Sequence, residues 1–239
     1  MAANHSRGSI KPLLNKLPDA RALHNKYNCA SPFPHVVLDN AFDDRVLRKI
    51  AKEASGDIAT WKELEHKHVA KKFVCSNPKK FGPVTRELIQ ELQSTSFCKW
   101  LEQLTGHRDV ISDPHIMGGG LHAISTGGRL EIHADFNYSK QLASRRIINL
   151  LIYLNDDWKD KWGGHLELWN RSMTKKEVRV APKLGNVVLF NTDSTSYHGH
   201  PEPLTCPEGV YRKSIALYYY KKGEPVEESH STLYQVRKG

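Results

Sequence analysis

The stretches GGGLHAI (118–124), GGRLEIHAD (127–135) and RRIINLLIYLN (145–155) set the character of this 239-residue sequence. Each is a short apolar run bounded by glycine, asparagine or aspartate, which is the pattern of a β-strand between turns. Four more runs of this kind follow: GGHLELWN (163–170), KEVRVAP (176–182), GNVVLFNTD (185–193) and RKSIALYYY (212–220). Seven or eight strands at regular spacing predict a β-sandwich or a jelly-roll barrel.

The sequence before residue 110 has a different pattern. Residues 1–30 are polar and predict an N-terminal arm with a short helical segment. The run SPFPHVVLDN (31–40), bounded by prolines and asparagine, predicts a strand. DDRVLRKIAKEA (43–54) and residues 83–105 carry the amphipathic pattern of helices, the first of them with an aspartate as its N-terminal cap.

We therefore expect a mainly β protein with N-terminal helices. Helical support at about 40–105 and a barrel at about 110–222 are expected to form a single domain over 31–239. Hydrophobic residues make up 39% of the chain and charged residues 26%, which is enough apolar material for a core and excludes a disordered, collagen-like or coiled-coil chain.

Composition also bears on location and partners. No apolar stretch approaches 18 residues and the N-terminus lacks an apolar signal segment, so we expect no membrane span and no secretion. Four widely spaced cysteines without a CxxC motif predict free thiols and a cytoplasmic location. The first 80 residues hold 15 basic and 8 acidic side chains, which indicates either an acidic partner or a solvated lysine-rich surface.

Histidine is abundant, so His-x-Asp/Glu triplets need context before they carry meaning. With 13 histidines, roughly 1.4 such triplets are expected by chance. The chain has three: His133-Ala134-Asp135, His165-Leu166-Glu167 and His200-Pro201-Glu202. The first lies in a predicted strand, where alternate residues share a face, so Glu131, His133 and Asp135 would face one side. Either a metal ion or bulk water would satisfy such a polar face.

Downstream residues favour the metal. GNVVLFNTD precedes His198, and the strand RKSIALYYY would place Arg212 and Ser214 on one face. Two histidines and one carboxylate on a β-barrel form the facial triad of non-haem Fe(II) oxygenases. An arginine one strand later offers a planar fork for a carboxylate, and the serine hydroxyl adds a hydrogen bond.

These residues occur in the order of a known family. They are His133-Ala-Asp135, LLIYLN (150–155), WGGHLEL (162–168), APKLGNVVLF (181–190), His198 and Arg212-Lys-Ser214. Over roughly 115–220 the sequence thus resembles the prolyl 4-hydroxylase-like Fe(II)/2-oxoglutarate dioxygenases. PFPHVVLDNAF (32–42) also resembles the opening segment of the bacterial members. The resemblance implies a double-stranded β-helix, the jelly-roll barrel of this family.

The resemblance also implies a reaction and a site. Fe(II) would be held by His133, Asp135 and His198. The far carboxylate of 2-oxoglutarate would be bound by Arg212, with Tyr153 and Ser214 in contact. The implied reaction consumes O2 and 2-oxoglutarate, yields succinate and CO2, and hydroxylates an unactivated C–H bond, with ascorbate as a further expected cofactor.

Several alternatives stay open for individual residues. His200 can replace His198 as the distal ligand, and Lys213 can replace Arg212 as the anchor. His122 is a candidate contact of the cosubstrate or the substrate, whereas His165 is expected in the barrel wall or at the surface. The gap between His198 and Arg212 is longer than in compact members of the family, which bears on the anchor.

The substrate is not readable from these motifs. We expect a protein or peptide side chain, in the manner of prolyl 4-hydroxylases; the alternatives are a free amino acid or small biosynthetic intermediate, and a non-catalytic metal-binding β-barrel. Nucleic-acid repair enzymes of this chemistry have a second arginine six residues past the first, where this chain has Tyr218. Asp135 is present, which favours hydroxylation over halogenation. The oligomeric state is left open.

Overall fold

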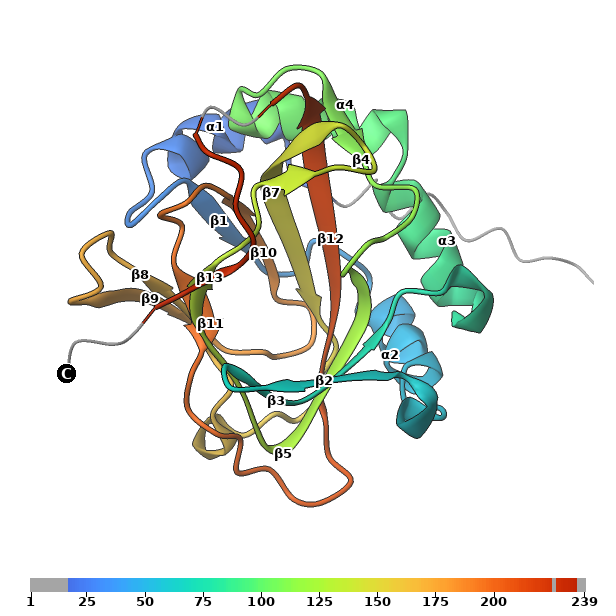
Figure 1. Ribbon diagram of the computed structural model, residues 1–239. Coiled ribbons are helices and arrows are strands. Elements are labelled where there is room, and N and C mark those ends of the chain that lie inside the picture. Colours follow the sequence, from blue (N-terminus) through green and yellow to red (C-terminus); the bar gives the residue numbers. More distant parts are fainter. Residues whose placement is uncertain (1–16, 225–226, 236–239) are drawn as a thin grey trace, which may run out of the picture.

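The computed structural model describes residues 17–224 and 227–235. Within them a thirteen-stranded antiparallel sheet bends into a nearly closed barrel, and the helices gather along one side of it (Figure 1). The prediction of a mainly β, jelly-roll fold with N-terminal helices is confirmed. Most of the expected arm at 1–30 lies outside the described residues, which begin at residue 17.

The helices begin and end where the sequence supplies caps. They are α1 (Ala20–Asn28), α2 (Asp44–Glu53), α3 (Pro83–Leu92) and α4 (Thr95–Thr105). The side chains of Asp19, Asp43 and Ser94 accept backbone N–H groups in the first turns of α1, α2 and α4, which satisfies donors that a helix start leaves unpaired. Gly106 ends α4 at a φ of 78°, a left-handed conformation that glycine adopts without strain.

Eight strands form the main path of the sheet. Their order is β1, β10, β7, β12, β5, β11, β8, β9. Their bounds are β1 (His35–Leu38), β10 (Val187–Asn191), β7 (Ser144–Tyr153), β12 (Arg212–Lys222), β5 (Gly120–Ala134), β11 (His198–His200), β8 (Leu166–Trp169) and β9 (Lys176–Val180). Shorter or flanking strands join this path: β2 (Lys62–His66), β3 (Val69–Cys75), β4 (Val110–Ser112), β6 (Tyr138–Ser139) and β13 (Leu233–Tyr234).

Side-chain alternation in β7 and β12 separates two environments. Ile148, Leu150 and Ile152 face the helices in the larger core cluster, together with residues of α2, α3 and α4. Asn149 and Leu151 instead face the barrel interior, where they line a cavity. The same strands thus bury one face against helices and present the other to the site. In the described part of the chain, no helix has the length and apolarity needed to cross a membrane.

Two features differ from the expected strand pattern. The runs at 118–124 and 127–135 form one long strand, β5, because the chain continues through Gly127 at a φ of 75° instead of turning back. The basic stretch 61–80 lacks the apolar run of a strand, yet it contains the hairpin β2–β3, which pairs with β5. This pairing extends the sheet alongside the barrel interior.

Candidate active site

Two histidines and an aspartate meet inside the barrel. His133, near the end of β5, pairs in antiparallel register with His198 at the start of β11, and Asp135 follows β5 directly. Nε2 of His133 lies 3.6 Å from Oδ1 of Asp135, and Nε2 of His198 lies 3.4 Å from Oδ2. All three potential ligand atoms lie within 4.8 Å of one another.

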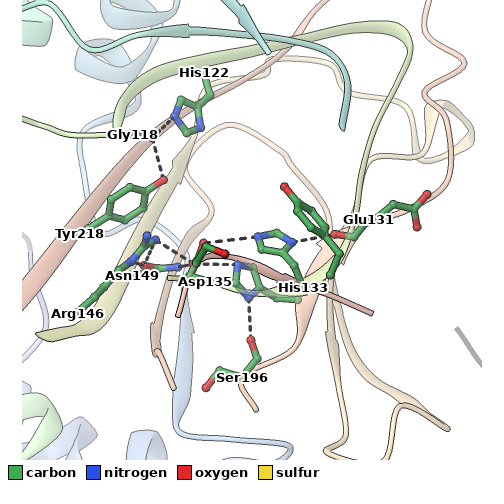
Figure 2. A network of polar contacts seen from close by, with 12 residues as sticks. Gly118, His122, Glu131, His133, Asp135, Arg146, Asn149, Ser196 and Tyr218 are labelled. Atoms are coloured by element: carbon green, nitrogen blue, oxygen red, sulfur yellow. Dashed lines mark hydrogen bonds and ion pairs between the residues drawn. The ribbon is translucent and has the colours of Figure 1, made fainter. Parts of the chain in front are cut away.

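Backbone carbonyl groups orient both imidazole rings. Nδ1 of His133 donates to the carbonyl oxygen of Glu131 (2.8 Å), and Nδ1 of His198 donates to that of Ser196 (2.9 Å) (Figure 2). This arrangement leaves each Nε2 facing the aspartate, with a lone pair available. Burial and the neighbouring His198 lower the pKa of His133, so its ring is neutral at pH 7, the form that binds a metal.

Arg146 and Asn149 of β7 hold the carboxylate. Oδ2 of Asp135 accepts from Nη2 of Arg146 (2.9 Å) and from Nδ2 of Asn149 (2.7 Å) (Figure 2). The guanidinium also lies over the Tyr218 ring, 3.4 Å from its centroid. Burial alone raises the pKa of the Asp135 carboxyl, but Arg146 and His198 outweigh it and hold that pKa well below its usual value. The carboxylate is therefore ionised and oriented.

These three side chains fit a ferrous ion. The donor set is two imidazoles and one carboxylate, the set of the two-His, one-carboxylate facial triad. The three groups are largely buried, and their Nε2 and Oδ atoms face one another. A cation at their centre would interact favourably with all three groups at once.

The strand preceding the triad departs from simple alternation. Glu131, expected on the same face as His133 and Asp135, instead accepts from Nε of Arg129 (3.2 Å) and does not line the cavity. Leu130 lines it in place of Glu131. The cause is an irregularity in the β5–β11 pairing, where His198 opposes His133 but His200 opposes Leu130. Because β5 has one extra residue at this point, the side chains that precede His133 on β5 face the opposite side from the one that simple alternation predicts.

A cavity of about 80 Å³ opens beside the triad. Apart from the triad it is bounded by side chains of β3, β5, β7, β8, β11 and β12. These residues are Lys72, His122, Ile124, Leu130, Asn149, Leu151, Leu166, Gly199, His200, Arg212, Ser214, Ala216 and Tyr218. Among the described residues that line it, Asp135 is the only acidic one.

Arg212 and Ser214 lie on the cavity side of β12, as expected. Nε of Arg212 donates to the carbonyl oxygen of Gly164 (2.6 Å), and its Nη2 donates to the hydroxyl of Tyr153 (3.2 Å). The guanidinium has five N–H donors, so donors remain for a carboxylate in the cavity. Tyr153 contacts the guanidinium through its hydroxyl and its ring, and it does not line the cavity.

The remaining candidates take different places. Lys213 lies on the opposite face of β12, where its amine donates to the carbonyl oxygen of Ala51 (3.0 Å). His165 accepts from Nη2 of Arg179 at Nδ1 (2.9 Å), away from the cavity. His122 lines the cavity, and its Nε2 lies 3.1 Å from the carbonyl oxygen of Gly118. His200 lines it too, outside the metal-binding group.

Two residues near the site, Lys72 and Tyr234, carry no signal in the motif spacing, whereas strand alternation places Tyr218 on the face of Arg212 and Ser214. Lys72 reaches the cavity from β3, about 60 residues before the triad. Tyr218 lines the cavity beneath Arg146, and Tyr234 of β13 lies 5.6 Å from the His133 ring, measured between centroids. Burial lowers the pKa of the Lys72 amine to about 8, partly offset by Asp135, so the amine is protonated at pH 7. Only the pairing of β3 with β5 reveals Lys72.

The choice between His198 and His200 as metal ligand can be tested by substitution. We expect His198→Ala to weaken Fe(II) binding by more than about 100-fold, since losing even an outer-shell partner costs 10–100-fold. His200→Ala should keep Fe(II) affinity within about threefold of wild type. Anaerobic calorimetric titration with Fe(II) measures both. Stronger loss in His200→Ala than in His198→Ala would move the ligand to His200.

Known protein structures share this architecture. A prolyl-4-hydroxylase from Pseudomonas putida superposes with a TM-score of 0.58 at 16% identity, covering 85% of this chain and 100% of that one. A prolyl hydroxylase from Trichoplax adhaerens, in complex with a hypoxia inducible factor peptide fragment, superposes with a TM-score of 0.58 at 15% identity over 84% and 89% of the two chains. A prolyl 4-hydroxylase from Phytophthora capsici gives 0.57 at 20% identity over 88% and 64%.

The sequence comparison agrees with the fold. No curated protein matches the chain. Residues 119–220, which run from the start of β5 into β12 and contain the triad, Tyr153 and Arg212, match the sequence model of the 2OG-Fe(II) oxygenase superfamily. Residues 119–220 therefore carry a 2OG-Fe(II) oxygenase domain on a prolyl hydroxylase-like fold, which supports a dioxygenase activity.

Proposed function

We propose that this dioxygenase hydroxylates a side chain of a protein or peptide, with Fe(II) held by His133, Asp135 and His198. The observation that carries the proposal is the buried triad, which faces a cavity whose wall contains an arginine. Bound Fe(II) and 2-oxoglutarate would supply O2 activation for oxidation of an unactivated C–H bond. The peptide class rests on the likeness to prolyl hydroxylase folds, one of which was solved with a peptide.

The chain's own residues would bind and orient the metal ion and the cosubstrate. The two Nδ1 hydrogen bonds fix the rings of His133 and His198, and Arg146 with Asn149 fixes one oxygen of Asp135, so three ligands are preorganised before metal arrives. Arg212, backed by the phenol of Tyr153, would bind the distal carboxylate of 2-oxoglutarate, with Ser214 beside it. His122 would contact the cosubstrate or the substrate from β5.

Four further statements belong to this proposal. Residues 31–239 are proposed to act as one domain, because the described helices share a core cluster with the barrel strands. A cytoplasmic location agrees with four free cysteines. Ascorbate as a reductant and an acidic partner for the basic N-terminal third stay predictions.

Mass spectrometry of a cell extract tests the function. The extract is incubated with Fe(II), 2-oxoglutarate and either the wild-type chain or Asp135→Ala. We expect a peptide that gains one oxygen atom only with the wild type, together with succinate. Succinate together with an oxygenated small molecule, and with no oxygenated peptide, would contradict the peptide class. No succinate under any condition would contradict the oxygenase itself.

A further inference from the structure

A bulge in β3 directs the side chain of Lys72 into the interior of the barrel. Val69 opposes Leu130, which lines the cavity, so regular alternation would next aim Lys71 inward. Instead the register shifts between Ala70 and Lys72, and Lys71 adopts a φ of 51°. Lys71 becomes exposed, with its amine on the carbonyl oxygen of Thr126 (3.1 Å), and Lys72 faces the cavity. Bulges near active sites commonly re-aim a side chain in this way.

Lys72 arrives there without a partner. Lys72 is half-buried in the cavity wall, and among the described residues its amine makes no hydrogen bond or ion pair. Lys72 of β3 and Arg212 of β12 both pair with Ile124 of the strand between them, β5. The three residues therefore lie in one row across the sheet. Two strand spacings, about 10 Å between Cα atoms, therefore separate Lys72 from the arginine that faces the cosubstrate. Among charged groups, Asp135 influences the amine most, ahead of Arg212.

His200 borders the same cavity with its hydrogen-bonding capacity unused. Its residue is 3% exposed, and neither Nδ1 nor Nε2 has a partner in the described structure. A buried imidazole without a hydrogen bond is costly, so its presence calls for a polar group in the cavity. A neutral imidazole can donate one N–H to an anion.

The charges around the cavity indicate which polar group would bind beside Lys72 and His200. Arg146 offsets Asp135 through their direct hydrogen bond. Fe(II) and Arg212 more than offset the two carboxylates of 2-oxoglutarate, so the positive charge of Lys72 stays unmatched after the cosubstrate binds. No second acidic side chain is available among the described residues that line the cavity. The missing anion has to come with the substrate.

We propose that Lys72 and His200 form a subsite for a carboxylate of the molecule that is oxidised, beside the 2-oxoglutarate pocket. The proposal rests on the oxygenase function proposed above and specifies its substrate class. For a peptide substrate, the carboxylate is that of a Glu or Asp close to the oxidised residue. For a free amino acid, it is the α-carboxylate.

Acetate and its neutral analogue acetamide probe the subsite directly. Each is titrated calorimetrically, without O2, into the chain loaded with Fe(II) and saturating 2-oxoglutarate. We expect wild type to bind acetate at least about tenfold more tightly than acetamide, and Lys72→Met to lose that preference. His200→Leu should weaken acetate binding severalfold. Lys72→Arg, which keeps the charge, should retain the preference.

Lys71→Met is the matched control. It removes the same charge from the adjacent residue of β3, whose side chain is exposed, so acetate binding should not change. Equal acetate affinity in wild type and Lys72→Met would overturn the proposal. So would a Lys72→Met variant that binds acetate normally but 2-oxoglutarate weakly, because Lys72 would then belong to the cosubstrate pocket. Failure of wild type to bind 2-oxoglutarate at all would instead refute the oxygenase function.

Two matched pairs then identify the source of the carboxylate. L-proline is compared with L-prolinamide, and the capped dipeptide Ac-Pro-Glu-NH2 with Ac-Pro-Gln-NH2. A preference for the acidic member that disappears in Lys72→Met supports the subsite and names the source: a peptide for the second pair, a free amino acid for the first. An acidic preference that survives in Lys72→Met would contradict the role of Lys72.

Discussion

Asp135→Ala is expected to abolish succinate formation and to weaken Fe(II) binding by more than about 100-fold, while the fold persists. The carboxylate is one of the three proposed ligands, and two imidazoles alone hold a ferrous ion poorly. The substitution does not change the hydrophobic core, in which Ile132 and Val188 are fully buried. Arg146 loses its ion pair but keeps the Asn149 oxygen (2.6 Å) and the Tyr218 ring.

Three measurements separate this result from general damage. Calorimetry gives the Fe(II) affinity, succinate release gives turnover, and thermal unfolding followed by circular dichroism reports the fold. Asp160→Ala is the matched control, because Asp160 is an exposed aspartate paired with Lys183 at the surface, and it should behave as wild type. Near wild-type turnover in Asp135→Ala would contradict the proposed metal site.

Arg212→Ala is expected to raise the KM for 2-oxoglutarate by about 30-fold or more. Arg212 is only 5% exposed, so loss of its charge leaves a buried carboxylate unpaired, which costs on the order of 2–5 kcal/mol. Arg212→Lys should lie between wild type and alanine, because a point charge cannot reproduce two parallel N–H bonds. Steady-state kinetics with varied 2-oxoglutarate measures the KM of each variant.

Lys213→Met provides the control for charge and position. Lys213 is adjacent in sequence but lies on the helix side of β12, bonded to the carbonyl oxygen of Ala51. Its loss should leave the KM for 2-oxoglutarate unchanged, even where stability falls. If Lys213→Met raises that KM and Arg212→Ala does not, the cosubstrate anchor must be reassigned.

Local signals were sufficient for most of the fold. The amphipathic pattern and the caps predicted α2, α3 and α4, because helix ends depend on residues within one turn. Period-two alternation predicted β12 with the correct facing of Arg212, Lys213 and Ser214. The order of motifs along the chain indicated a 2OG-Fe(II) oxygenase domain.

Alternation failed where the ladder contains an extra residue. The expected facing of Glu131 was wrong and Leu130 took its place, because the β5–β11 pairing is irregular between its two histidine positions. The bulge at Lys71 has the same origin in β3. A bulge is set by how two strands align, so one strand's sequence does not show it.

By itself, the sequence determined most of the helices and barrel strands, the resemblance to an oxygenase domain, and which residue types were available for a metal and a carboxylate. These follow from contacts within a few residues, or from the order of motifs along the chain. Only the tertiary structure decided that Arg146 and Asn149 hold Asp135, and that Lys72 shares a cavity with His200. Those contacts join segments 11 to 128 residues apart, and their geometry exists only after β3, β5, β7 and β11 have paired.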